Sequence, residues 1–124
     1  MGSLTADKFR HMVREKFKPD TPNMQLIHAA MGISGEAGEL VDCIKKHVIY
    51  GQEMDMHNLI EELGDVEFYL EAMRQRIGLD REDILEANIQ KLSVRYKGGF
   101  TTDESKLRAD KRQLELFEQG MNHD

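Results

Sequence analysis

The sequence contains a single cysteine, Cys43, no tryptophan and only two prolines. One cysteine excludes an internal disulfide, and it favours a reducing compartment such as the cytoplasm. No apolar run approaches the roughly 20 residues of a membrane-spanning helix, and the first residues lack the apolar core of a secretory signal. An excess of positive charge is also missing, because the net charge is −6. We therefore expect a cytoplasmic protein that binds neither nucleic acid nor membrane surfaces.

Strand-like alternation is absent as well, and the apolar residues recur instead at helical spacing. Proline and glycine residues punctuate this pattern where helices are expected to begin and end. The connections between the expected helices are short, which favours antiparallel neighbours. The sequence predicts a single domain of residues 1–124, an all-α antiparallel bundle. Its four core helices are expected over residues 4–17, 22–50, 56–77 and 80–97, with a peripheral C-terminal helix over about 103–119.

Apolar stripes on the two long helices predict the core. The stripe on residues 22–50 comprises Leu26, Ala30, Ile33, Ala37, Leu40, Val41, Ile44 and Val48. The stripe on residues 56–77 comprises Leu59, Leu63, Val66, Leu70, Met73 and Ile77. Three further apolar residues, Ile60, Phe68 and Ala72, lie off the second stripe. A second apolar face predicts a second neighbour, and we interpret these three residues as part of a subunit interface.

Two acidic clusters are interrupted by glycines. The first holds Glu36 and Glu39 within Gly32–Asp42, and the second holds Glu62 and Asp65 around Gly64. Glycine inside a helix costs about 1 kcal/mol relative to alanine, so its repeated use suggests a close approach to the backbone. Residues three apart lie on one helical face, about 5–6 Å apart at Cβ. Each acidic pair therefore points in one direction.

Such acidic pairs also occur by chance, as at Asp80 and Asp83, where a solvated surface is the ordinary interpretation. The pairs on the two long helices differ because they border the predicted apolar stripes. Antiparallel packing would bring both acidic edges to one groove, where mutual repulsion raises carboxyl pKa values. A divalent cation removes that repulsion, and oxygen-only ligands suit Mg²⁺ or Mn²⁺. We therefore predict a metal site, with close helix packing as the alternative explanation of the glycines.

A polar stripe follows on the fourth expected helix, where Asn88, Lys91 and Arg95 precede Tyr96. Two cations and an amide suit a metal-bridged polyphosphate, although a solvated face would look the same. Lys46 could reach a phosphate or simply complement the end of its helix. His28 continues the acidic face and could touch a base or sugar, or be an ordinary surface residue.

The five histidines show neither the HExxH nor the ExxH spacing of zinc and di-iron sites. This argues against a metal-carboxylate oxidase bundle, which is one alternative hypothesis. A second alternative is a non-enzymatic helical module that binds nucleotides or another protein. The apolar second face of residues 56–77 motivates this alternative.

Three segments in order resemble the MazG-like all-α nucleoside triphosphate pyrophosphohydrolases. They are Gly35-Glu36-x-Gly38-Glu39-Leu40, Glu61-Glu62-Leu63-Gly64-Asp65 and Asn88-x-x-Lys91-Leu92-x-x-Arg95-Tyr96. The first two match the family's ExxE and ExxD motifs, and the resemblance covers about residues 24–108, within an expected core of about 22–108. Many members carry a further acid where this chain has Gly35, which leaves the number of metal ions open.

The resemblance implies hydrolysis of an NTP or dNTP between its α and β phosphates, giving a monophosphate and pyrophosphate. It implies Mg²⁺, with Mn²⁺ as a substitute, held by Glu36, Glu39, Glu62 and Asp65, with Glu61 supporting them. Either Glu36 or Glu39 would be the catalytic base. Substrate binding would fall to Asn88, Lys91, Arg95 and Tyr96, with Lys46 and His28 as further candidates. A homodimer or homotetramer is also implied. The sequence does not decide the base or sugar, and a deoxynucleotide such as dGTP, dCTP or dUTP is one candidate substrate.

Overall fold

The computed structural model describes residues 3–96, 114–115 and 118, and all regular structure among them is helical. The chain divides into two compact units, residues 1–80 and 81–124, which are described separately. The all-α prediction is therefore confirmed, whereas the bundle of four core helices and the single domain remain predictions. Most of the expected C-terminal helix lies outside the described residues, and the part that is described, residues 114–115 and 118, is helical. No described helix is long and apolar enough to cross a membrane.

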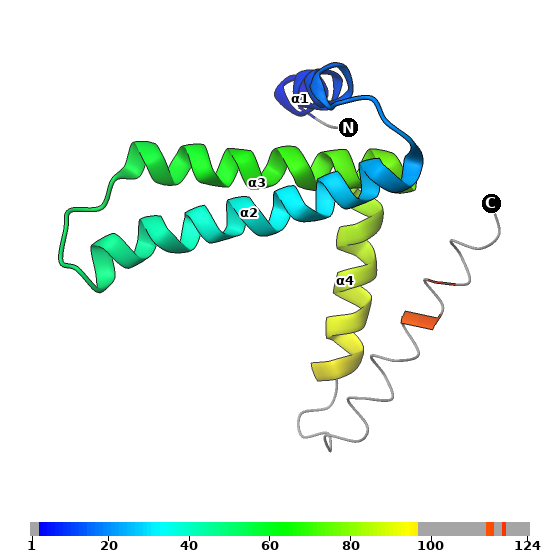
Figure 1. The fold of residues 1–124 in the computed structure, drawn as a ribbon. Coiled ribbons are helices and arrows are strands. Elements are labelled where there is room, and N and C mark those ends of the chain that lie inside the picture. Colours follow the sequence, from blue (N-terminus) through cyan, green and yellow to red (C-terminus); the bar gives the residue numbers. More distant parts are fainter. Residues whose placement is uncertain (1–2, 97–113, 116–117, 119–124) are drawn as a thin grey trace. The chain divides into compact units, whose positions relative to one another are not determined.

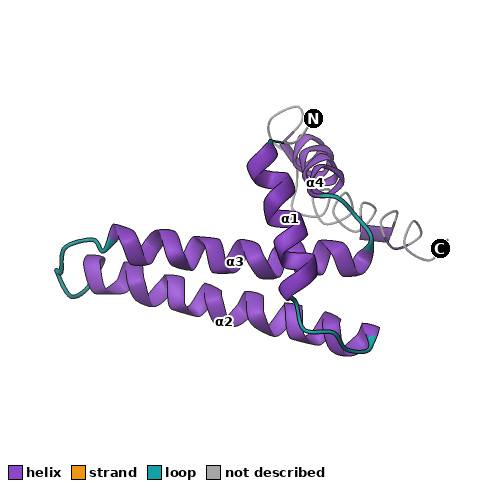
Figure 2. Ribbon diagram, turned by 90° about the horizontal axis from the view of Figure 1, so that it is seen from above, coloured by secondary structure: helices purple, strands orange, loops and turns teal. Residues whose placement is uncertain are grey.

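The first unit contains three helices: α1 (Leu4–Lys16), α2 (Pro22–Val48) and α3 (Met56–Ile77). Helices α2 and α3 lie side by side as a hairpin, and α1 crosses α3 (Figures 1 and 2). The starts of α1 and α2 are capped by Ser3 and Thr21, whose hydroxyl oxygens each accept the backbone N–H of the residue three positions further on. These caps satisfy donors that a helix start otherwise leaves unpaired.

The hairpin turns through residues 49–55. Gly51 has a φ of 71°, a left-handed conformation that glycine adopts without strain. Asp55 then caps α3, because its carboxylate accepts the backbone N–H of Asn58 at 3.0 Å. At the other end, Gly78 stops α3 with a φ of 74°. Turn and cap residues thus fix the length of the hairpin.

The buried core of the first unit lies where all three helices meet. Val13 of α1, Ala29 of α2 and Ala72 of α3 are almost fully buried, and Phe68 packs against them. The interpretation of Ala72 as an interface residue is therefore wrong, because it is buried within the chain. Phe68 is half-buried against the same core, and its interface role remains a prediction. Ile60 is 63% exposed and remains available for an interface.

The predicted apolar stripe of α2 is only partly buried. Five of its eight residues are exposed, namely Ala30, Ala37, Val41, Ile44 and Val48. The prediction that the whole stripe forms the core is wrong for this chain alone. Helix α2 has α3 as its main packing neighbour within the first unit, and one neighbour covers only part of a helix. Much of the apolar surface of α2 thus stays uncovered.

The second unit begins with α4 (Arg81–Tyr96). Glu82 and Asp83 lie in its first turn and Arg95 in its last, an arrangement that complements the helix dipole. It begins directly after Asp80, the residue predicted to open this helix.

Candidate functional site

The acidic groove predicted from the sequence corresponds to a cluster of three carboxylates, Glu36 on α2 and Glu62 and Asp65 on α3. Carboxylate oxygens of these three residues all lie within 4.8 Å of one another. Glu62 and Asp65 share a face of α3 because they are three residues apart, and the hairpin sets that face against α2. Three of the four predicted metal ligands thus lie together, although their role remains a prediction.

The carboxylate of Glu62 is destabilised by its surroundings in the acidic groove. Burial is the largest cause that raises the pKa of Glu62 above its ordinary value. Its hydrogen bond with Glu36 and the charges of Glu36, Glu39 and Asp65 raise this pKa further. Its Oε2 atom is buried and has no hydrogen-bond partner among the described residues. A buried acceptor without a partner is unusual, because such atoms lose water without compensation.

These two observations suit a divalent cation. The donor set consists of carboxylate oxygens alone, which Mg²⁺ and Mn²⁺ prefer. A cation at the groove would offset the repulsion and give the unpartnered Oε2 atom a favourable contact. Glu36, Glu62 and Asp65 therefore fit the expected metal, with Glu62 at the centre.

Glu39 lies one turn from Glu36 and is exposed. It is not part of the three-residue group, yet its charge contributes to the raised pKa of Glu62. Glu39 thus borders the groove as a carboxylate open to water.

Two other predicted residues have surface partners. Glu61 lies 2.8 Å from Nε2 of His57, and Lys46 lies 3.4 Å from a carboxylate oxygen of Asp42. All four side chains are more than half exposed. Supporting and substrate-binding roles for Glu61 and Lys46 remain predictions.

An aromatic cluster continues the groove toward the start of α2. The ring of His28 stacks on Phe17 at a centroid distance of 4.6 Å, and Tyr69 lies 5.9 Å from His28. Tyr69 follows Asp65 by one helical turn, and Gly32 precedes Glu36 by one turn. A Cβ atom on Gly32 would collide with the Tyr69 ring, so this glycine makes room for it.

Sequence reasoning did not identify Tyr69 or Phe17 as site residues. The i+4 spacing from Asp65 to Tyr69 was the available signal, because it places both side chains on one face of α3. The prediction that the glycines mark a close approach to the backbone holds at Gly32, where Tyr69 of the neighbouring helix lies close. Gly35, Gly38 and Gly64 have open space around them, so close helix packing does not explain them.

The α4 candidates belong to the second unit. Lys91 and Arg95 are half-buried, whereas Asn88 and Tyr96 are exposed. Their spacing along one helix matches the predicted polar stripe. Because the two units are described separately, binding of substrate by these residues remains a prediction.

Comparison with known protein families identifies a domain in this chain. The family described as the MazG nucleotide pyrophosphohydrolase domain matches residues 27–100, more than half of the chain. The matched region includes all four predicted metal ligands and the whole of α4. No curated protein and no solved structure gives a significant match.

Proposed function

Because the chain belongs to the MazG nucleotide pyrophosphohydrolase family, we propose that it hydrolyses a nucleoside triphosphate to monophosphate and pyrophosphate with Mg²⁺. The observation that carries the proposal is the acidic groove, where Glu36, Glu62 and Asp65 meet around the unpartnered Oε2 of Glu62. An anionic triphosphate would not approach this groove without cations, so substrate and metal are expected to bind together.

Glu36, Glu62 and Asp65 would hold Mg²⁺, which supplies charge neutralisation on the phosphates and lowers the pKa of bound water. Glu39 is our candidate for the general base, because it is exposed beside the group and outside it. Its carboxylate would take the proton from water as the oxygen attacks phosphorus and pyrophosphate departs. Lys91 and Arg95 would stabilise charge on the leaving pyrophosphate.

The aromatic cluster supports a position for the nucleoside. Tyr69 and His28 lie one and two helical turns along the hairpin from the acidic residues. Flat aromatic rings of this kind stack on a nucleobase or pack against a sugar. We place the nucleoside there, with a deoxynucleotide such as dGTP, dCTP or dUTP as the candidate substrate.

A substrate panel tests the reaction. We expect that incubation with each NTP and dNTP and Mg²⁺ gives monophosphate and pyrophosphate, which ³¹P NMR distinguishes from other products. EDTA should stop the reaction, and Mn²⁺ should replace Mg²⁺. Diphosphate plus orthophosphate would contradict the cleavage position. Nucleotide binding without turnover under either metal would instead support a non-enzymatic binding module.

We also propose that the chain forms a homodimer or homotetramer through the uncovered face of α2. Val41, Val48 and Ile49 are each more than 60% exposed. They line an apolar groove of about 430 Å³ together with Leu40, Ile44 and Lys45. Exposed apolar surface of this extent is typical of an interface.

Light scattering should therefore give at least twice the chain mass of 14.3 kDa. The double substitution Val41→Asp and Val48→Asp should lower the mass, because both residues share one helical face. Leu4→Asp, at an equally exposed position on α1, is the matched control and should leave the mass unchanged. A monomeric wild-type protein would contradict the proposal.

A further inference from the structure

A second polar pocket lies in the first unit, apart from the acidic groove. It has a volume of about 460 Å³ and contains none of the four predicted metal ligands. Its walls come from α1, from the start of α2 and from the C-terminal part of α3. The lining residues are Arg10, Arg14, Phe17, Gln25, Glu71, Ala72, Arg74, Gln75, Arg76, Gly78, Leu79 and Asp80.

The pocket concentrates positive charge in a chain whose net charge is −6. Four of its lining residues are arginines, whereas only two, Glu71 and Asp80, are acidic. The sign of the local charge is thus opposite to that of the whole chain and of the acidic groove.

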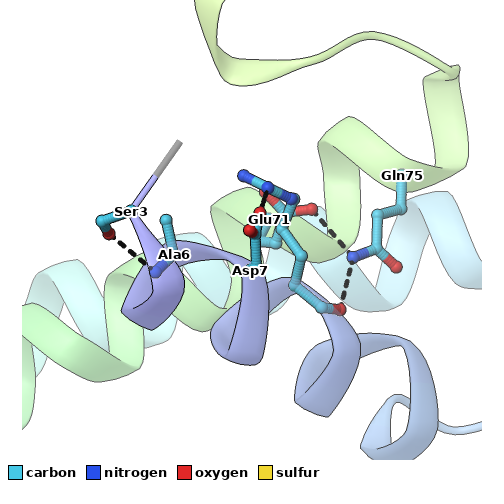
Figure 3. A network of polar contacts seen from close by, with 6 residues as sticks. Ser3, Ala6, Asp7, Glu71 and Gln75 are labelled. Atoms are coloured by element: carbon cyan, nitrogen blue, oxygen red, sulfur yellow. Dashed lines mark hydrogen bonds and ion pairs between the residues drawn. The ribbon is translucent and has the colours of Figure 1, made fainter. Parts of the chain in front are cut away.

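One side of the pocket is a fixed hydrogen-bond network. Glu71 is 5% exposed and accepts bonds from Nε of Arg74 at 2.9 Å and from Nε2 of Gln75 at 2.8 Å. Gln75 also donates to the backbone oxygen of Arg10 at 3.0 Å, which ties α3 to α1 (Figure 3). Arg10 pairs with Asp7 on the same helix. This side of the pocket is preorganised, and the charge of Arg74 is compensated within it.

The remaining two arginines are not compensated in this way. Arg76 donates to the side-chain oxygen of Gln25 at 3.2 Å, a neutral partner. Neither Arg14 nor Arg76 forms an ion pair with a carboxylate among the described residues. Two exposed guanidinium groups therefore line one pocket, and neither is paired with a carboxylate among the described residues.

We propose that this pocket binds a phosphate-bearing small molecule through Arg14 and Arg76. The planar fork of guanidinium matches phosphate oxygens in a bidentate manner. The volume lies within the range of small-molecule sites, about 300–1,000 Å³. Pyrophosphate and a phosphate monoester share the recognised chemistry. The pocket shares none of the four predicted metal ligands with the acidic groove, although Phe17 belongs both to its lining and to the aromatic cluster.

Calorimetric titration of the full chain in EDTA and about 0.15 M salt tests this site, because the acidic groove should not retain phosphates without metal. The probes are inorganic pyrophosphate and adenosine monophosphate. We expect saturable binding of at least one probe, with about tenfold or greater weakening in the Arg14→Gln, Arg76→Gln double variant, because two charge-assisted contacts are lost. Binding of pyrophosphate alone would identify an inorganic diphosphate ligand, and binding of adenosine monophosphate would identify a phosphate monoester; both are products of the proposed reaction.

The double variant Lys8→Gln, Lys16→Gln is the matched control. It removes the same charge from exposed positions of α1 that do not line the pocket, and its affinity should change less than twofold. Absence of saturable binding, or equal weakening in the control, would overturn the proposal. Because turnover is not measured, this outcome is separate from that of the hydrolysis assay.

Discussion

Glu62→Gln is expected to abolish hydrolysis and, at the same time, to raise the Tm of the metal-free protein at neutral pH. Glutamine keeps the shape of the side chain and removes the charge that Glu36, Glu39 and Asp65 oppose. It also removes the central ligand of the predicted metal. Loss of several kcal/mol of transition-state stabilisation corresponds to a rate at least about 100-fold lower.

The pH dependence follows from the direction of the shift. The pKa of Glu62 is higher in the folded chain than its ordinary value of 4.5, so the folded state holds this proton more tightly than the unfolded state. Stability therefore falls as pH rises from about 4.5 through the raised pKa, if other groups are set aside. The stability of the Glu62→Gln variant should lack this pH dependence. The difference in Tm between the variant and the wild-type protein should therefore vanish at low pH.

Thermal melts in EDTA and in Mg²⁺ measure both effects. Saturation at 100 times the dissociation constant adds about 2.7 kcal/mol to the wild-type protein, and this gain should be absent in the variant. Glu53→Gln makes the same charge change at an exposed loop position and should alter neither rate nor Tm. A variant that melts below the wild-type protein in EDTA, or that keeps its turnover, would contradict the assignment of Glu62.

Gly32→Ala is expected to have the second large effect. The added methyl group would collide with the ring of Tyr69, which would have to move. Overpacking of this kind costs about 1–3 kcal/mol. The better helix propensity of alanine returns up to about 1 kcal/mol, so we expect a net loss of about 1–2 kcal/mol in the free energy of unfolding.

Gly35→Ala is the matched control, because nothing lies within 4 Å of its added Cβ. This substitution should stabilise α2 by up to about 1 kcal/mol, the opposite sign. If Tyr69 contacts the nucleoside, Gly32→Ala should also raise KM more than it lowers kcat. Denaturant unfolding of both variants gives the comparison, and equal stability changes would show that the ring does not confine Gly32.

The helices were predictable because capping residues set their ends. Thr21, Asp55 and Gly78 were identified from the sequence, and the structure places each at a helix boundary. The predicted ends of α2 and α3 differ from the observed ends by two residues at most. Hydrogen bonds between residues close in sequence decide where a helix begins and ends, so the helix ends can be predicted from the local sequence.

Packing partners were less predictable. The helical period shows which face of α2 is apolar, but not whether α1, α3 or another chain covers it. Small residues mark the place where α1 packs, because Ala29 and Ala72 are buried together with Val13 of α1. Larger apolar residues elsewhere on α2 stay exposed. Tyr69 was missed for a related reason, because its proximity to Gly32 depends on the register between two helices.

The bond between Gln75 and the backbone of Arg10 spans 65 residues of sequence. The α2–α3 hairpin, by contrast, closes through the short segment 49–55. Since closure entropy grows with the logarithm of loop length, docking α1 onto α3 before the hairpin has closed would cost about 2 kcal/mol more chain entropy than closing the hairpin. We therefore expect the hairpin to close before α1 docks onto α3. The arginine pocket, which needs α1 for a wall, is then completed only after the hairpin has closed.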